Sequence, residues 1–408
     1  MGRPWNGDSS RRASTKGLLA KTQTVETMLS TTRLAVRATI TQGGDGKLET
    51  FDNELTGRYE AIIQQQRLNW TTHHRLLRVL GKGGQGIVFL TERRGADQFT
   101  LPIAIKIFSP ERFRSAREYD EAMARMARVA SYVAQIQHDN LLYVHNFVDR
   151  RRIRGMVMEW VDGYDIRRLL TNRMLEAIEP RVSPVRWEYL NRVLVTAGPV
   201  HPRFKPGVAV AIVRECLTAL AALHRHGVVH GDIKPSNIML KVTGNAKIVD
   251  IGSAFRLEDP PPVYTCTPAY AAPEVLEGQP ATPLSDLASL GYVLIELLAG
   301  RPLFADLDNL RDLLEARRSL PQQLHDIVPH EVAVNDLLMK FCCGMIAPDP
   351  MRRFASAEAA ELLKDAGAAA FHRQLVMSDM ASEYNNEIRL WLEELKSLED
   401  DTRERGTP

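Results

Sequence analysis

One short stretch of the chain carries side chains that could act together in phosphoryl transfer. It reads His230-Gly231-Asp232-Ile233-Lys234-Pro235-Ser236-Asn237 and follows an apolar run. An aspartate can accept the proton of a hydroxyl, a lysine can neutralise phosphate oxygens, and an asparagine amide can face a metal ion. Such chemistry depends on placing groups and stabilising charge. Asp232, Lys234 and Asn237 are therefore the first candidates for a catalytic site.

A glycine-rich segment and the strand after it are the candidates for binding the phosphate groups that such a reaction requires. A predicted strand over residues 77–80 runs into Gly81-Lys82-Gly83-Gly84-Gln85-Gly86, and the next predicted strand, 102–107, carries one lysine, Lys106. Glycines let backbone amides approach phosphates without interference from a Cβ atom. A lysine in an apolar strand is costly to bury unless it is paired. The two segments together predict that a nucleotide phosphate group binds here.

These segments, in this order, resemble protein kinases. Residues 230–237 resemble the catalytic loop and 81–86 the glycine-rich loop of that family, and Asp250-Ile251-Gly252 resembles its D-F-G turn with Ile for Phe. Residues 156–165 resemble the strand and hinge that hold adenine. Six motifs occur in family order over residues 77–365, which is identified as a bacterial-type, eukaryotic-like serine/threonine kinase domain with His-Gly-Asp in the catalytic loop.

The resemblance implies ATP and Mg²⁺ as cofactors and a role for each motif residue. Asp232 would orient and deprotonate the acceptor hydroxyl, and Lys234 would steady the γ-phosphate. Lys106 would bind the α- and β-phosphates, while Asn237 and Asp250 would hold the metal ion through oxygen atoms. The residues implied in nucleotide binding are Gly81, Gly83, Gly86, Val88, Ala104, Lys106, Met158, Glu159, Val161, Asp165 and Met239.

A predicted helix over residues 115–137 offers two glutamates as the partner of Lys106. Glu118 lines up with Met126 and other apolar residues on one face, whereas Glu121 shares its face with several arginines. We therefore expect Glu118 to pair with Lys106, with Glu121 as the alternative. The helix is longer than the family usually has before His138, so an inserted turn could shift the register.

The segment from Thr267 to Glu274 indicates the acceptor. It resembles the peptide-substrate loop and A-P-E anchor of serine/threonine kinases, Arg353 matches the partner of that glutamate, and Asp286 matches an aspartate that braces the catalytic loop. Aminoglycoside phosphotransferases share a His-Gly-Asp motif but lack this loop and its arginine partner. The position of Lys234 favours Ser/Thr over Tyr acceptors, again by resemblance.

Two departures from the family pattern bear on regulation. Family members that switch by loop phosphorylation have an arginine at the place of Gly231, where it grips the phosphate. The usual phosphothreonine position is Val263, which cannot be phosphorylated. We expect a kinase that is active without activation-loop phosphorylation. Cys266 and Ile251 are further substitutions, and the sequence leaves open whether they lower activity.

Composition predicts a soluble cytoplasmic protein. The chain has 408 residues, is 44% hydrophobic and 25% charged, and carries a net charge of +2, which gives no reason to expect nucleic acid or an anionic membrane as partner. Its four cysteines include no C-x-x-C pair, as suits a reducing compartment. The sequence shows neither a signal peptide nor an apolar run of about 18–20 residues.

The predicted organisation is an α+β, two-lobed kinase fold with a β-rich amino-terminal lobe, a helical carboxy-terminal lobe and helical extensions at both ends. Residues 1–72 form an extension, partly disordered and with one amphipathic helix near 51–63; 73–365 form the kinase domain, with an insertion of unknown role over 171–206; 366–408 form a helical tail. Apolar residues of the tail repeat at heptad-like spacing from Tyr384. We expect the tail to dock on the kinase domain or the amino-terminal helix, with homodimerisation as the second alternative.

The function we expect is transfer of the γ-phosphate of ATP to Ser or Thr hydroxyls of a protein substrate. The alternative is a pseudokinase that binds nucleotide and scaffolds a complex without turnover. The substitutions at Gly231, Ile251 and Cys266 and the uncertain helix glutamate favour the alternative. Every residue assigned to chemistry is retained, which favours the enzyme.

Overall fold

The computed structural model describes residues 40–41, 53–65, 67–69, 73–95, 97–376 and 384–405. All of them belong to one structural unit of the chain. The disorder expected in the amino-terminal extension falls outside the described residues, as does Phe51 of its predicted helix.

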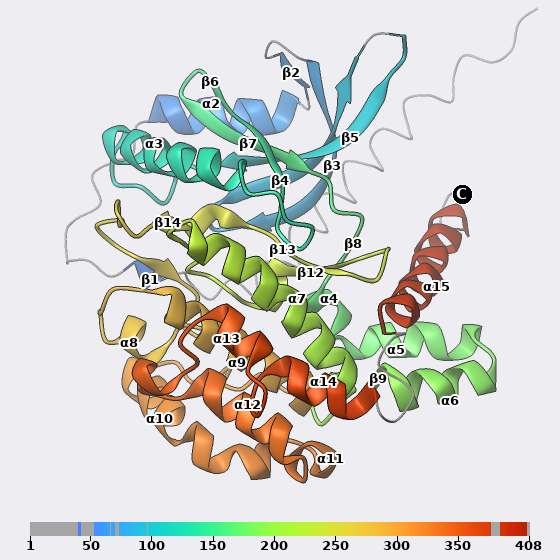
Figure 1. The fold of residues 1–408 in the computed structure, drawn as a ribbon. Coiled ribbons are helices and arrows are strands. Elements are labelled where there is room, and N and C mark those ends of the chain that lie inside the picture. The colour runs from blue at the N-terminus through green and yellow to red at the C-terminus, as the bar shows by residue number, and fades with distance from the viewer. Residues whose placement is uncertain are drawn as a thin grey trace, which may run out of the picture. The chain divides into compact units, whose positions relative to one another are not determined.

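A six-stranded antiparallel sheet forms the amino-terminal lobe (Figure 1). Its strand order is β2-β3-β4-β5-β7-β6. β5 lies between β4 and β7 and is buried from Ile103 to Phe108, so the sequence of this strand is an almost continuous apolar run. The strands are β2 (Arg67–Asn69), β3 (His73–Gly83), β4 (Gly86–Arg94), β5 (Thr100–Phe108), β6 (Val144–Arg150) and β7 (Ile153–Glu159).

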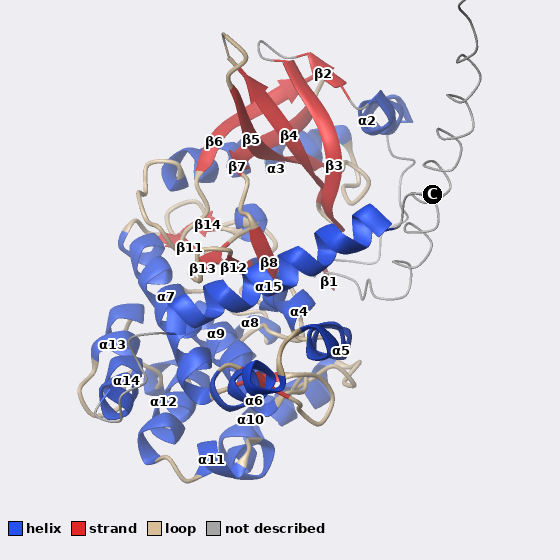
Figure 2. Ribbon diagram, turned by 90° about the vertical axis from the view of Figure 1, so that its right-hand side faces the viewer, coloured by secondary structure: helices blue, strands red, loops and turns tan. Residues whose placement is uncertain are grey.

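Two helices pack against this sheet. α3 (Ala116–Val133) crosses one face of it (Figure 2), and its buried Tyr119 accepts a hydrogen bond from the N–H of Arg154 at 2.9 Å. α2 (Asn53–Gln65) contacts β2 and β7 and buries Leu55, Tyr59 and Ile62. The predicted amphipathic helix of the amino-terminal extension is confirmed.

The carboxy-terminal lobe is built around α7 (Pro206–Arg225) and α9 (Pro283–Ala299). Both helices begin at proline, whose missing N–H costs nothing in the first turn. By length and apolar composition α7 would suit a membrane span, but here it packs against α9, α13 and α14. The other helices are α4 (Ile166–Leu169), α8 (Pro273–Leu276), α10 (Leu310–Ile327), α11 (His330–Ala333), α12 (Asp336–Ile346), α13 (Ala357–Leu362) and α14 (Ala368–Val376). The two-lobed kinase fold predicted from the sequence is confirmed.

Short strands bring the segments of the site together. One sheet has the order β13-β12-β8, another pairs β11 with β14, and a third pairs β1 with β15. The β11·β14 pair ties the segment before the catalytic loop to the segment after Asp250. These strands are β1 (Ile40–Thr41), β8 (Gly163–Asp165), β11 (Val228–Val229), β12 (Ile238–Lys241), β13 (Ala246–Ile248), β14 (Phe255–Arg256) and β15 (Thr265–Cys266).

The insertion supports the carboxy-terminal helix. It folds into α5 (Asn172–Ile178), α6 (Pro184–Val193) and a hairpin of β9 (Val195–Thr196) and β10 (Arg203–Phe204). α15 (Tyr384–Arg405) contacts α5 and α7.

Docking of α15 combines apolar and charged contacts. Trp391 is fully buried and meets the ring of Phe204 edge-on at 5.9 Å between centroids. The guanidinium of Arg186 pairs with Glu387 at 3.0 Å and with Glu394 at 2.9 Å. The apolar face of α15 is therefore covered by the same chain, as our first interpretation expects, and dimerisation through it stays a prediction.

Candidate active site

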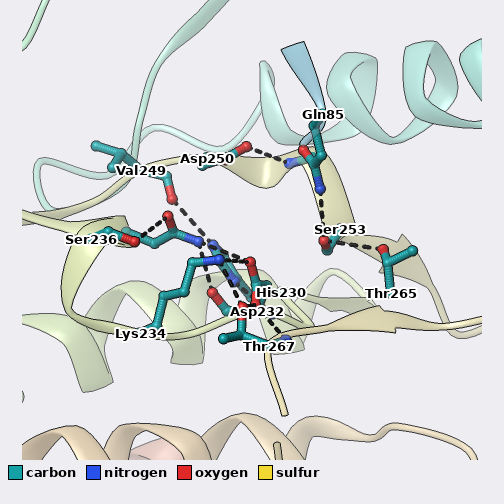
Figure 3. A network of polar contacts seen from close by, with 12 residues as sticks. Gln85, His230, Asp232, Lys234, Ser236, Val249, Asp250, Ser253, Thr265 and Thr267 are labelled. Atoms are coloured by element: carbon teal, nitrogen blue, oxygen red, sulfur yellow. Dashed lines mark hydrogen bonds and ion pairs between the residues drawn. The ribbon is translucent and has the colours of Figure 1, made fainter. Parts of the chain in front are cut away.

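The catalytic loop places Asp232 and Lys234 around the hydroxyl of Thr267 (Figure 3). Lys234 Nζ lies 2.6 Å from Asp232 Oδ2 and donates to Thr267 Oγ1 at 2.8 Å. Thr267 donates to Asp232 Oδ1 through its hydroxyl at 2.7 Å and through its N–H at 3.0 Å. A hydroxyl in this place can pass its proton to Asp232 while Lys234 faces its oxygen.

The backbone of this loop is held by a buried carboxylate, that of Asp286 in α9. Asp286 accepts hydrogen bonds from the N–H groups of His230 at 2.8 Å and Gly231 at 2.9 Å, and contacts His224 Nε2 at 2.9 Å. Burial would raise the pKa of Asp286, but the hydrogen bond and charge of His224 lower it overall. The predicted bracing role of this residue agrees with these contacts.

Asp250 lies at a left-handed backbone position, with φ 63°, before the short 3₁₀ turn η4 (Ile251–Ser253). Ile251 is fully buried and so serves as the apolar plug expected at this place. Asp250 accepts a hydrogen bond from the N–H of Gly252 at 3.0 Å and lies 2.5 Å from Lys106 Nζ. Burial would raise the pKa of Asp250, but the charge and hydrogen bond of Lys106, with smaller effects of Gly252 and Lys234, lower it to about 2.

Asn237 and Asp250 fit the expected Mg²⁺ site in their chemistry. Asn237 donates through Nδ2 to the backbone oxygen of Asp232 at 2.8 Å, so its amide oxygen is the atom available as a ligand. The low pKa of Asp250 keeps its carboxylate charged at neutral pH. A hard cation prefers such oxygen ligands, and the remaining ones would come from phosphate and water.

Gln85, at the tip of the glycine-rich loop, reaches into the same site (Figure 3). Its Oε1 accepts a hydrogen bond from Lys106 Nζ at 2.7 Å, and its Nε2 donates to Ser253 Oγ at 3.1 Å. The loop is thereby tied to the segment after Asp250. Gln85 was not among the predicted site residues, because the glycine pattern places no constraint on the residues between the glycines.

The expected pair between Lys106 and Glu118 is not formed in this structure. The carboxylate of Glu118 accepts a hydrogen bond from the N–H of Arg114 at 2.8 Å, and its own N–H is capped by Ser115. Glu118 lies in the first turn of α3 and is exposed to solvent, while Glu121, the alternative, pairs with Arg117 at 2.8 Å. Helical spacing predicted that Glu118 would lie on the apolar face of α3, but its side chain is exposed, so spacing alone did not show which residue it would meet.

The strands and hinge bring the residues implied in adenine and ribose binding together. Ala104 on β5 pairs with Met158 on β7, and Asp165 on β8 pairs with Met239 on β12. The Asp165 side chain also accepts a hydrogen bond from the N–H of Arg168 at 3.0 Å and so caps α4. The two remaining hinge positions, Glu159 and Val161, flank Trp160 between β7 and β8.

The hinge strand is anchored on both sides. Glu159 donates its N–H to the oxygen of Tyr143 at 3.0 Å, and its carboxylate lies 2.5 Å from Lys247 Nζ on β13. Asp162 pairs with Lys396 of α15, which links the tail to the hinge.

The glycine-rich loop has the hairpin geometry that its sequence predicts. Gly81 pairs with Val88 and Gly83 with Gly86 across β3 and β4. Gly86 has φ 142°, and a Cβ there would lie 2.0 Å from the oxygen of Ile107. Only glycine fits at this position.

The substrate loop is anchored at its carboxy-terminal end as predicted. Glu274 accepts two parallel hydrogen bonds from Arg353, each 2.7 Å long, and one from Ser285 Oγ at 2.8 Å. Bidentate pairs of this kind fix orientation as well as position. In the middle of the loop, Tyr270 donates its hydroxyl to Glu296 at 2.6 Å.

His201 of the insertion contacts Glu296, the residue of α9 that binds Tyr270 of the substrate loop. His201 lies with Nε2 3.7 Å from Glu296 and Nδ1 2.8 Å from the oxygen of Pro202. Burial lowers the pKa of His201, but the nearby carboxylate of Glu296 and the hydrogen bond to Pro202 outweigh it and raise the pKa overall.

An arginine in place of Gly231 would have a strained backbone at this position. The φ of Gly231 is 76°, and a Cβ built on it would lie 3.0 Å from the oxygen of Ser253. Beside it, Val229, Phe255 and Ala281 form a small apolar cluster, and the ring of Tyr264 packs edge-on against Phe255 at 5.1 Å. Apolar packing of Phe255 and Tyr264 thus holds this part of the activation loop, the segment of residues 250–274.

Comparison with known proteins agrees with this geometry. Residues 74–365 match the family described as Protein kinase domain. The chain is 29% identical over 293 residues to the serine/threonine-protein kinase PrkC of Bacillus subtilis, covering 70% of this chain and 39% of the relative. It is 31% identical over 267 residues to PkaA of Streptomyces coelicolor (60% and 43%), and 31% identical over 291 residues to PknD of Mycobacterium tuberculosis strain H37Rv (70% and 38%).

The match covers well over half of the chain, so the protein belongs to the protein kinase family, and its relatives are bacterial-type serine/threonine kinases. The chain spans only about two fifths of the length of these curated relatives.

Proposed function

We propose that this protein is a serine/threonine protein kinase that uses ATP and Mg²⁺. The observation that carries the proposal is the position of the Thr267 hydroxyl, which donates to Asp232 at 2.7 Å and accepts from Lys234 at 2.8 Å. Thr267 shows that an aliphatic hydroxyl fits between the two residues. A substrate Ser or Thr would take this place in the reaction.

In the proposed reaction Asp232 accepts the hydroxyl proton as the hydroxyl oxygen bonds to the γ-phosphorus, while the bond from that phosphorus to the bridging oxygen of ADP breaks. Lys234 stabilises the charge on the transferred group. Lys106 leaves Asp250 to bind the α- and β-phosphates. Asn237 and Asp250 would hold Mg²⁺, which when bound neutralises charge on the phosphate oxygens.

We further propose that activity does not depend on phosphorylation of the activation loop. The apolar cluster around Phe255 and Tyr264 supports this, because it occupies the neighbourhood of Gly231, where phosphate-binding family members have an arginine. Burying a dianionic phosphate against an apolar cluster would be costly without such a cation.

A nucleotide-binding pseudokinase is the second candidate. The observation that favours it is the contact of Lys106 with both Asp250 and Gln85, with Glu118 turned to Arg114. In an enzyme this arrangement must rearrange when ATP binds; in a scaffold it could persist.

The partners and location that we propose follow from this function. A protein substrate and ATP are required, a cytoplasmic location would supply ATP, and neither nucleic acid nor membrane is needed as a partner. Homodimerisation through α15 would need that helix to leave the insertion.

The proposal is tested by incubating the protein with labelled ATP, Mg²⁺ and a generic basic protein, followed by phosphoamino-acid analysis. Asp232→Asn removes the proton acceptor, and Arg352→Ala, an exposed residue beside Arg353, serves as the control. Label on Ser or Thr that disappears with Asp232→Asn and remains with Arg352→Ala supports the kinase. Nucleotide binding without any transfer would favour the pseudokinase.

A further inference from the structure

Arg317 of α10 is a fully buried arginine that lies outside the motifs discussed above. Its Nε donates to the oxygen of Ala271 at 2.7 Å, and its Nη2 donates to the oxygen of Pro268 at 2.6 Å. Both acceptors belong to the substrate loop. A single side chain from a helix far along the sequence therefore binds two carbonyl groups of the loop.

The surroundings of Arg317 make this contact specific for a guanidinium group. Its Cζ lies 4.2 Å from the ring centroid of Phe304 and 5.0 Å from that of Tyr292. Among the described residues no carboxylate lies within ion-pair distance of Arg317. Because a buried cation is costly without partners, it is held by the two loop carbonyls, the two ring faces and the oxygen of Leu313, to which Nη1 donates at 3.4 Å. A lysine would lose the fork geometry and the stacking.

The contact with Pro268 lies next to the catalytic centre. Pro268 follows Thr267, whose N–H and hydroxyl both donate to Asp232. Arg317 thus fixes the peptide unit between Pro268 and Ala269, which begins one residue after Thr267. The other loop anchors described above, Tyr270 with Glu296 and Glu274 with Arg353, lie further along the loop.

We infer that Arg317 is a positioning residue that sets the substrate loop for the acceptor peptide. The inference rests on the proposed kinase function for its kinetic consequence only. Loss of Arg317 lets Pro268 and Thr267 shift relative to Asp232. This shift lowers kcat/KM for the acceptor peptide. Binding of ATP depends on Lys106, Asp250 and the hinge, so the affinity for ATP does not change when Arg317 is lost.

The kinetic test compares Arg317→Lys and Arg317→Met with Arg318→Met, an exposed neighbour on the same helix that pairs with Glu277. Two charge-assisted hydrogen bonds are lost in Arg317→Met, so kcat/KM for peptide is expected to fall about tenfold to hundredfold, with KM for ATP changed by less than about twofold. Arg318→Met is expected to match the wild type. Equal losses for ATP and peptide, or no loss in either Arg317 variant, would overturn the inference.

Chemical rescue separates positioning from simple loss of folding. Arg317→Ala leaves a cavity between the two rings, and added guanidinium ion at millimolar concentration is expected to restore part of the peptide kcat/KM in that variant alone. Rescue of Arg318→Met to the same degree, or rescue of neither, would count against the inference.

Amide hydrogen exchange tests the order of the substrate loop without requiring catalytic activity. The amides of residues 265–272 are expected to exchange about tenfold faster in Arg317→Lys than in the wild type, while those of α9 stay unchanged. If the wild type transfers no phosphate, the kinase proposal fails, and this measurement still decides whether Arg317 orders the loop. Unchanged exchange in the loop would refute the inference even if the protein proves to be a kinase.

Discussion

Lys106 Nζ lies 2.5 Å from the carboxylate of Asp250, so the lysine expected to bind phosphate in one lobe is paired with the expected metal ligand of the other. Gln85 adds a second bond to the same ammonium group at 2.7 Å. If the protein binds ATP as we propose, the nucleotide phosphates must compete with groups of the protein for Lys106. We therefore expect Gln85, at the tip of the glycine-rich loop, to influence ATP affinity.

Gln85→Ala is expected to bind ATP more tightly, because one competing acceptor of Lys106 is lost. The hydrogen bond from the Lys106 ammonium to the neutral amide oxygen of Gln85 is lost in this variant, so we expect Kd for ATP to fall about threefold to tenfold. Gln85→Glu is the matched opposite: its carboxylate would pair with Lys106 and repel phosphate, so Kd is expected to rise. Calorimetry without peptide measures both, and weaker binding by Gln85→Ala would contradict the interpretation.

Gly231→Ala is expected to destabilise the protein by about 1–2 kcal/mol, the typical penalty of a left-handed backbone for a residue with a Cβ. The close oxygen of Ser253 adds to the cost. The control is Gly57→Ala in α2, where a Cβ meets nothing within 4 Å. That change should raise stability by about 0.5–1 kcal/mol, as glycine disfavours helices. Urea unfolding distinguishes the two, and equal effects of both substitutions would argue against a backbone role for Gly231.

The contact of His201 with Glu296 should make stability depend on pH as the pH rises above the ordinary pKa of histidine. The raised pKa of His201 in the folded protein means that its stabilising effect is fully present below the unfolded pKa and is lost as pH rises through the folded value. The difference in unfolding free energy between wild type and His201→Gln is therefore expected to be largest near pH 6 and to shrink toward pH 9. A difference that is constant or grows over this range would show that the charge of His201 plays no part.

Trp391→Ala should cost about 3–5 kcal/mol, the typical range for an aromatic side chain deleted from a packed site. Arg389→Ala, a partly exposed residue of the same helix whose ion pair runs to Glu393 one turn further on, should change stability by less than about 0.5 kcal/mol. Thermal unfolding of the full chain measures both. If Trp391→Ala were as stable as the wild type, α15 would not be docked as the structure has it.

The parts of the site that depend on local spacing were predictable from the sequence. Asp232, Lys234 and Asn237 lie within one loop, and the turn at Asp250 follows a hairpin, so short-range patterns are enough to select them as candidates. The fold followed from the order of these motifs.

The contacts that were not predicted join segments far apart in the chain. Gln85 meets Ser253 across 168 residues, and Arg317 meets Pro268 across 49. Periodicity identifies the face of a helix that is buried but not the partner it meets, which is why Glu118 was expected to reach Lys106. Arg317 shares its face of α10 with the buried residues Leu313 and Leu324, and a charged residue in such a stripe was the available signal.

The most direct test of the central claim is phosphate transfer by the wild type and by Asp232→Asn under the same conditions, with nucleotide binding measured in parallel. We expect label on Ser or Thr of the protein substrate for the wild type, a loss of at least about a hundredfold for Asp232→Asn, and equal nucleotide binding by both. Transfer that survives the loss of the Asp232 carboxylate, or a wild type that binds nucleotide and transfers nothing, would contradict this claim.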